Sequence, residues 1–218
     1  MNLPDYVSVE RRRVKWVRVQ IHPGGEVRIV IPHRYSMDRL VQIYRKKRHW
    51  IEGKRQHLLA DPASKFGIDP EEVLLFGKGY RFEVASSDAT DIDHQQRRII
   101  SDRNLQDAEQ LLDWYTRLAK SYLPDRTALL ADRWGMEFNR VAVRAQKTRW
   151  GSCSALGNIS LNWKLVKTPV WVSDYVITHE LAHTRVMNHS PLFWAQVERL
   201  LPDYREARLW VRQYGAFL

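Results

Sequence analysis

The sequence contains little cysteine and no long apolar run. Its 218 residues include one cysteine, Cys153, which excludes an internal disulfide and favours a reducing compartment. No hydrophobic stretch approaches the roughly 20 residues of a membrane-spanning helix, and the first residues lack the apolar core of a secretory signal peptide. Repeats and low-complexity segments are also absent. We therefore expect a cytoplasmic protein with a proper hydrophobic core and no membrane contact.

Positive charge is concentrated in the N-terminal part. Residues 1–60 hold 14 Lys and Arg against 5 Asp and Glu, whereas residues 61–218 hold 21 against 20. The basic runs at 11–13 and 45–48 could bind nucleic acid or another polyanion, or could simply form a solvated surface. A separate nucleic-acid-binding motif is absent, so the sequence supports a nucleic-acid partner only weakly.

The pattern His179-Glu180-Leu181-Ala182-His183 is typical of zinc peptidases. Histidines four residues apart share a face of a helix and can bind one ion together. Glu180 lies off that line, where it could accept a proton from a water molecule as the catalytic base. The alternative is an amphipathic helix whose histidines bond to neighbouring carbonyl groups.

A third metal ligand has two candidates. His189 follows His183 by six residues, a gap that suits a helix end and a turn that brings a third imidazole back. Zinc peptidases with this spacing often carry a glycine in the turn, and this sequence has Val186 there. Glu198 is the alternative, because another class of zinc peptidases takes its third ligand from a Glu on a later helix. The spacing favours His189.

Periodicity and turn residues predict both strands and helices along the chain. Ser173 and Asp174 are expected to cap the helix that carries the two histidines, Pro124 to separate two helices, and Ser190-Pro191 to begin the next helix. The expected strands are 14–20, 27–31, 73–76, 80–84, 97–100, 138–145 and 159–162, with turns at 23–25 and 157–158 and loops at 61–72 and 86–93. The expected helices are 36–59, 105–122, 127–134, the metal helix from 173, 191–201 and 204–214.

Several blocks of the sequence resemble the YgjP-like metallopeptidases, relatives of the SprT-like zinc proteases. The similarity covers nearly the whole chain and is closest over the C-terminal 75 or so residues. The blocks are 147–154, 157–162, 174–183, 188–190 with 193–194, and 202–204.

The resemblance implies a zincin-like metallopeptidase fold of the α+β class. In this fold an N-terminal β-hairpin and helix region, residues 1–100, accompanies a zinc metallopeptidase core, residues 101–218, in one compact unit. The metal helix would pack on a small antiparallel or mixed sheet. The resemblance further implies Zn²⁺ bound by His179, His183 and His189, with Glu180 as the catalytic base.

The function expected from these observations is hydrolysis of peptide bonds in a peptide or protein substrate. Arg149, Asn162 and Tyr204 are candidates for stabilising the oxyanion, although each could equally make a structural hydrogen bond. We expect Cys153 to pack rather than act as a nucleophile, and Trp150 to belong to the core. The hairpin around residues 157–158 is the expected edge for pairing with a substrate strand.

Two alternative functions stay open from the sequence. A metal-dependent hydrolase could cleave a non-peptide bond, such as a nucleotide phosphoanhydride, and use the basic helix to hold phosphates. A nucleic-acid-associated, SprT-like protease would show DNA binding that weakens with salt and with neutralisation of residues 45–48.

Overall fold

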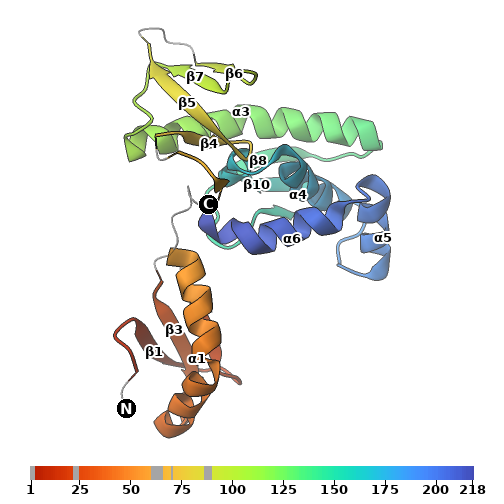
Figure 1. Ribbon diagram of the computed structural model, residues 1–218. Coiled ribbons are helices and arrows are strands. Elements are labelled where there is room, and N and C mark those ends of the chain that lie inside the picture. Colours follow the sequence, from red (N-terminus) through yellow and green to blue (C-terminus); the bar gives the residue numbers. More distant parts are fainter. Residues whose placement is uncertain (1–2, 22–24, 60–65, 70, 86–89) are drawn as a thin grey trace. The chain divides into compact units, whose positions relative to one another are not determined.

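The computed structural model describes residues 3–21, 25–59, 66–69, 71–85 and 90–218 (Figure 1). The expected turn at 23–25 and the expected loops at 61–72 and 86–93 fall partly outside these residues. Contacts within the chain form two compact units, residues 1–65 and residues 66–216. The boundary that the sequence suggested lay at residue 100; the strands between 73 and 101 instead share a hydrophobic core with the C-terminal elements.

The first unit is a three-stranded sheet with one helix. Its strands are β1 (Val7–Arg12), β2 (Arg18–Ile21) and β3 (Val27–Pro32), in the order β1-β3-β2. The predicted antiparallel pair is confirmed as β2 and β3, but the sequence analysis missed β1, which pairs in parallel with β3. Helix α1 (Met37–Leu59) follows. The core of this unit consists of Val27, Ile29, Ile31, Leu40, Tyr44 and Ile51.

The second unit begins with a four-stranded mixed sheet. Strands β4 (Val73–Leu75), β5 (Lys78–Val84), β6 (Asp91–Asp93) and β7 (Arg98–Ser101) lie in the order β4-β5-β7-β6. The predicted β4–β5 hairpin is confirmed. Strand β6 was missed because its short Asp-Ile-Asp sequence reads as a polar turn.

The long helix α3 (Ala108–Trp134) supports the rest of this unit (Figure 1). The predicted break at Pro124 is wrong, because the proline is accommodated inside one continuous helix. A proline removes one backbone hydrogen bond, but a buried stripe that continues past it can offset that loss. Here Ala119, Leu123 and Leu130 form such a stripe on both sides of Pro124.

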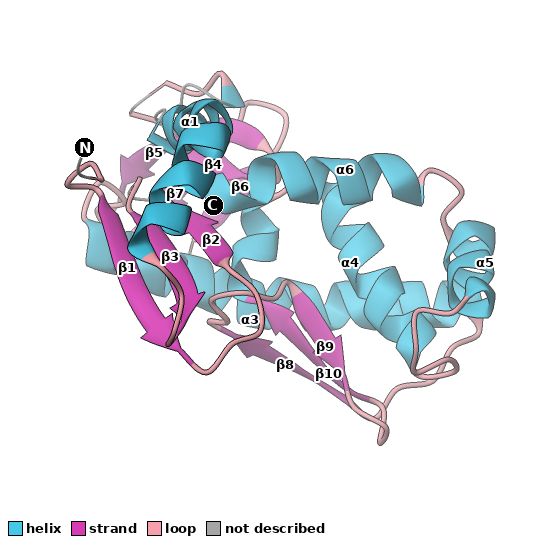
Figure 2. Cartoon of the chain, turned by 90° about the horizontal axis from the view of Figure 1, so that it is seen from below, coloured by secondary structure: helices cyan, strands magenta, loops and turns pink. Residues whose placement is uncertain are grey.

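A second, three-stranded sheet follows α3, with strands β8, β9 and β10 side by side (Figure 2). Strand β8 (Arg140–Arg144) pairs in parallel with β10 (Asn158–Asn162), and β9 (Gly151–Cys153) pairs antiparallel to β10. The predicted turn at 157–158 and the returning strand β10 are therefore confirmed, whereas β9 was not among the expected strands. The order β8-β10-β9 makes β9 an edge strand of this sheet.

Helices complete the second unit. A 3₁₀ helix, η1 (Trp163–Lys167), leads into α4 (Val170–His183), and α5 (Pro191–Leu200), α6 (Tyr204–Tyr214) and η2 (Gly215–Phe217) follow. The α+β class and the small mixed sheets agree with the prediction. Among the described residues, no helix combines the length and the apolar character needed to span a membrane.

Helix α4 starts earlier than the sequence suggested. Pro169 precedes its first residue, so Ser173 and Asp174 lie within the helix and do not cap it. The Ser173 hydroxyl donates to the carbonyl oxygen of Val170 (2.9 Å), and Asp174 accepts two hydrogen bonds from Arg126 of α3, at 2.7 and 2.6 Å. The polar pair that resembled a cap therefore has a tertiary role.

Candidate metal centre

Three histidines meet at the C-terminal end of α4. His179 and His183 come from the last turn and a half of α4, and His189 comes from the loop before α5. One ring nitrogen of each lies within 4.8 Å of those of the other two. The Nε2 atoms of His179 and His189 are 3.0 Å apart.

This cluster could hold a divalent metal ion, and the spacing of two of its nitrogens is compatible with zinc. Two nitrogens bonded tetrahedrally to one zinc at about 2.0–2.1 Å would lie about 3.3–3.4 Å apart, close to the separation of the two Nε2 atoms. His183 Nδ1 lies 3.0 Å from the carbonyl oxygen of Val186. If Nδ1 carries the proton and donates it there, Nε2 is left free as a ligand, which is the usual second contact of a metal-binding histidine.

The protonation of the histidines also suits metal binding. Burial, followed by the neighbouring His183 and His189, lowers the pKa of His179 to about 3. Burial lowers the pKa of His183 as well, although its bond to Val186 opposes the shift. Both rings are therefore neutral at pH 7, the form in which imidazole binds a metal. The buried Nδ1 of His179 has no hydrogen-bond partner in the part of the chain that the structure describes.

The turn that returns His189 does not need a glycine. Val186 occupies the position where zinc peptidases with this spacing often have one, and its backbone N–H donates to the carbonyl oxygen of Ala182 at 3.0 Å. Among the described residues, the only non-glycine residues with positive φ are Phe76 and Arg97, so Val186 is unstrained. The departure from the longer glycine-containing pattern is thus compatible with the position of His189.

Phe193 of α5 forms a wall against all three imidazoles. Its ring centroid lies 4.4 Å from that of His183, 4.8 Å from that of His179 and 4.9 Å from that of His189. Trp194 stacks on His189 at 5.7 Å. Sequence reasoning gave neither aromatic residue a role, although both lie on the helix that directly follows His189.

Glu180 lies beside the histidines in a cavity of about 350 Å³. Its side chain is 5% exposed, and this burial raises its pKa to about 8, while Arg149 acts in the opposite direction. A carboxyl group with a pKa near neutrality can both accept and release a proton at pH 7.

Gly151 of β9 makes room for Glu180. A Cβ atom at residue 151 would lie 2.6 Å from Glu180 Oε1, so no larger residue fits without displacement. Sequence reasoning missed this residue. The expected strands did not include residues 151–153, so no expected element marked this glycine as a point of close approach.

The remaining sequence candidates are placed as follows. Glu198 pairs with Arg205 (2.6 Å) and is not part of the histidine cluster. Asn162 donates to the carbonyl oxygens of Gln146 and Arg149, and Tyr204 stacks between aromatic rings, so both are used structurally. Arg149 is the one oxyanion candidate that lines the cavity.

Cys153 and Trp150 behave as packing residues. Burial raises the pKa of the Cys153 thiol to about 11, which keeps it protonated at pH 7 and a poor nucleophile. Trp150 is half-buried against the main core, and a Cβ atom at Gly215 would lie 2.9 Å from its ring.

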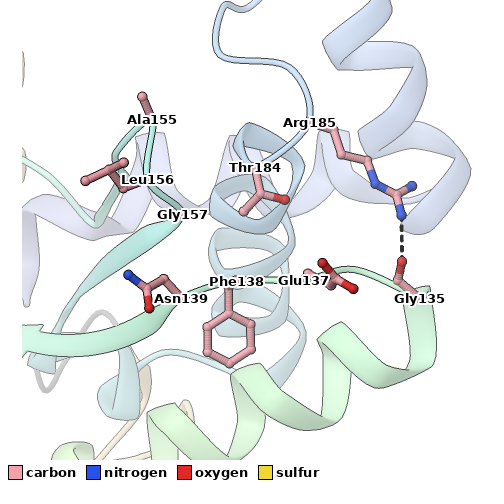
Figure 3. Close-up of a pocket in the computed structure, with 9 residues that line it drawn as sticks. All are labelled: Gly135, Glu137, Phe138, Asn139, Ala155, Leu156, Gly157, Thr184 and Arg185. Atoms are coloured by element: carbon pink, nitrogen blue, oxygen red, sulfur yellow. Dashed lines mark hydrogen bonds between the residues drawn. The ribbon is translucent and has the colours of Figure 1, made fainter.

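A larger cavity of about 560 Å³ lies beyond the C-terminal end of α4 (Figure 3). Arg185 reaches across it and donates to the carbonyl oxygen of Gly135 at 2.6 Å. Glu137 is the only acidic residue in its lining, which includes neither Glu180 nor any of the three histidines. The chemistry therefore belongs to the smaller cavity.

Comparison with known proteins adds a family match. The model of a family described as "YgjP-like, metallopeptidase domain" matches residues 15–214. Among solved structures, the metallopeptidase zymogen abylysin of Pyrococcus abyssi is 26% identical, with 41% of this chain and 93% of that chain covered and a TM-score of 0.37. The metallopeptidase zymogen jannalysin of Methanocaldococcus jannaschii is 20% identical, with 42% and 94% covered and a TM-score of 0.38. A search of the curated proteins gave no match.

Proposed function

The chain belongs to the YgjP-like metallopeptidase family, and from this premise we propose that it is a zinc-dependent peptidase acting on a peptide or protein substrate. His179, His183 and His189 would hold the zinc ion, and Glu180 would be the general base. The observation that supports this assignment most strongly is the meeting of three imidazole nitrogens within 4.8 Å beside a buried carboxyl group.

A zinc ion held by the three histidines would supply Lewis-acid chemistry, namely polarisation of a peptide carbonyl and a lower pKa for a water molecule. The Glu180 carboxylate accepts the proton of the attacking water and then donates it to the leaving amine. Burial favours the protonated carboxyl group, which can hold the proton between these two transfers, and the positive charge of Arg149 favours the carboxylate that accepts it.

Arg149 is our candidate for stabilising the oxyanion. Its side chain lines the same cavity as Glu180, and its positive charge would interact favourably with negative charge on the carbonyl oxygen. The substrate would pair with the free edge of β9, whose residues 151–153 line this cavity.

Replacing Glu180 with Gln tests the assignment of the base. The substitution keeps the size of the side chain and removes the proton acceptor. We expect Glu180→Gln to fold, to bind zinc nearly as well as wild type, and to lose about 10²–10⁴-fold in hydrolysis of a peptide pool. Full activity of the zinc-loaded variant would show that Glu180 is not the base. Hydrolysis of a nucleoside triphosphate, with no peptide cleaved, would overturn the peptidase assignment.

The ligand set is tested by metal analysis. We expect His179→Ala and His189→Ala each to lose most of the bound zinc. Glu198→Ala is the control, since its carboxylate pairs with Arg205, and it should keep one zinc per chain. Zinc lost in Glu198→Ala and retained in His189→Ala would contradict the assignment.

A further inference from the structure

A positively charged pocket adjoins the metal site. Its volume is about 260 Å³, and four cationic side chains line it: Lys147, Arg149, Lys164 and Arg212. Arg149 also lines the cavity that contains Glu180 and the three histidines. The two cavities are therefore neighbours with one arginine in common.

The described residues that line this pocket include no Asp or Glu. The nearby Glu180, in the adjoining cavity, interacts electrostatically with Arg149 alone among the four cations. Within the part of the chain that the structure describes, none of the four cations forms an ion pair with a carboxylate, although ion pairs occur elsewhere in the same unit. Like charges gathered in a concave site produce a positive potential that attracts anions.

Buried contacts hold the pocket in shape. The Asn162 side chain, 4% exposed, donates to the carbonyl oxygens of Gln146 (2.7 Å) and Arg149 (3.0 Å). Its Oδ1 accepts a hydrogen bond from the backbone N–H of Lys164 at 3.1 Å. One side chain thus ties the loop before β9 to the start of η1, and so fixes the backbone on two sides of the pocket.

The pocket also lies along the path expected for a substrate. Arg149 precedes the first residue of β9, Gly151, by two residues, and β9 is an edge strand. A peptide that pairs with β9 and continues past Gly151 would reach the loop that carries Lys147 and Arg149. Its side chains or its terminus would then meet the cationic pocket.

We propose that this pocket binds a carboxylate of the substrate, supplied by an Asp or Glu side chain or by the C-terminus. The inference rests on the proposed peptidase function and defines its substrate class as peptides that present a carboxylate to this pocket, from a side chain or from the C-terminus. A carboxylate fits the small volume and can accept hydrogen bonds from Arg and Lys together. Single-stranded nucleic acid is disfavoured because it needs aromatic rings for stacking, and the one aromatic residue here, Trp150, packs against Gly215.

Binding to the Glu180→Gln variant tests the proposal without any need for hydrolysis. Three fluorescein-labelled decapeptides are compared by fluorescence anisotropy: a Glu-containing peptide with an amidated C-terminus, its Gln counterpart, and the Gln counterpart with a free C-terminus. We expect about tenfold tighter binding of the first or the third than of the amidated Gln peptide. Tighter binding of the first assigns the pocket to an acidic side chain, and of the third to the C-terminus.

Charge neutralisation links the preference to the pocket. Adding Lys147→Gln and Arg212→Gln should reduce the tenfold preference to about twofold or less, because the contributions of two charge pairs add and together account for about a fivefold change. The matched control is Lys120→Gln with Arg199→Gln, two exposed cations that line neither pocket. This control removes the same charge and should keep the preference.

Equal binding of all three peptides, or equal loss in the control, would overturn the proposal. So would a ten-nucleotide single strand that binds more tightly than the acidic peptides and depends on Lys147 and Arg212. Charge-selective peptide binding that depends on these two residues, with no peptide cleaved by the wild-type protein, would instead refute the peptidase function and leave the carboxylate site standing.

Discussion

Replacing Gly151 with alanine tests whether β9 positions Glu180, the proposed general base. The new Cβ atom would lie 2.6 Å from Oε1, 2.7 Å from Cγ and 2.9 Å from Cδ of Glu180, all well inside van der Waals contact. Glu180 is 5% exposed, so its side chain has little free space and either the carboxylate or the strand must shift. Overpacking of this kind costs about 1–3 kcal/mol of stability. A displacement of about 1 Å at a reacting group can cost about 10²-fold in rate.

We therefore expect Gly151→Ala to lose about 100-fold in peptide hydrolysis and ~1–3 kcal/mol in the free energy of unfolding, while it keeps its zinc. Hydrolysis rate, metal content and urea denaturation would be measured on one preparation. Gly53→Ala in α1 is the control, because a Cβ atom there meets nothing within 4 Å. It should keep full activity and gain ~0.5–1 kcal/mol from helix propensity. Wild-type activity and stability in Gly151→Ala would refute the reasoning.

Three further predictions concern stability and the basic surface. Arg126→Met removes both hydrogen bonds to the largely buried Asp174 carboxylate and should lower the free energy of unfolding by ~1–3 kcal/mol in urea denaturation. Burial, with Lys164 nearby, lowers the pKa of Lys167 to about 8, below the 10.5 expected when unfolded, so the unfolded chain binds more protons between these values. The free energy of unfolding should thus rise from pH 8 to pH 10, and Lys167→Met should lack that rise. Changing the exposed residues 46–48 to Gln should leave hydrolysis and thermal unfolding nearly unchanged; a large loss of activity would make that surface a substrate site.

Local sequence signals predicted much of the fold. The β4–β5 hairpin follows from turn glycines between apolar runs and forms as expected, and the turn at 157–158 correctly indicated the returning strand β10. The sequence-based predictions failed where contacts between distant segments determine the secondary structure. Helix α3 continues through Pro124 because its buried stripe does so, and β1 pairs with β3 over a gap that no local pattern reveals.

The candidate site likewise has features that local sequence predicts and features that depend on contacts between distant segments. Helical periodicity placed His179, Glu180 and His183 on one stretch of helix, and turn length brought His189 to them. The contact between Gly151 and Glu180 joins residues 29 positions apart in sequence, and nothing in either segment alone specifies it. The cationic pocket likewise combines side chains from the loop before β9, from η1 and from α6.

Contacts at three positions along α4 hold the helix in place. They explain how His179 and His183 could be placed accurately enough to bind one metal ion. Asp174 binds Arg126 of α3 near the start of the helix, Glu180 packs on Gly151, and His183 stacks on Phe193 at the C-terminal end. Nine residues separate the first contact from the last, about 14 Å at 1.5 Å per residue. Contacts at both ends fix the tilt of a helix as well as its position, and metal ligands need placement within about 0.5 Å. Loss of the Arg126–Asp174 pair should therefore allow α4 to tilt and so weaken zinc binding, although this pair lies more than two helical turns from His183.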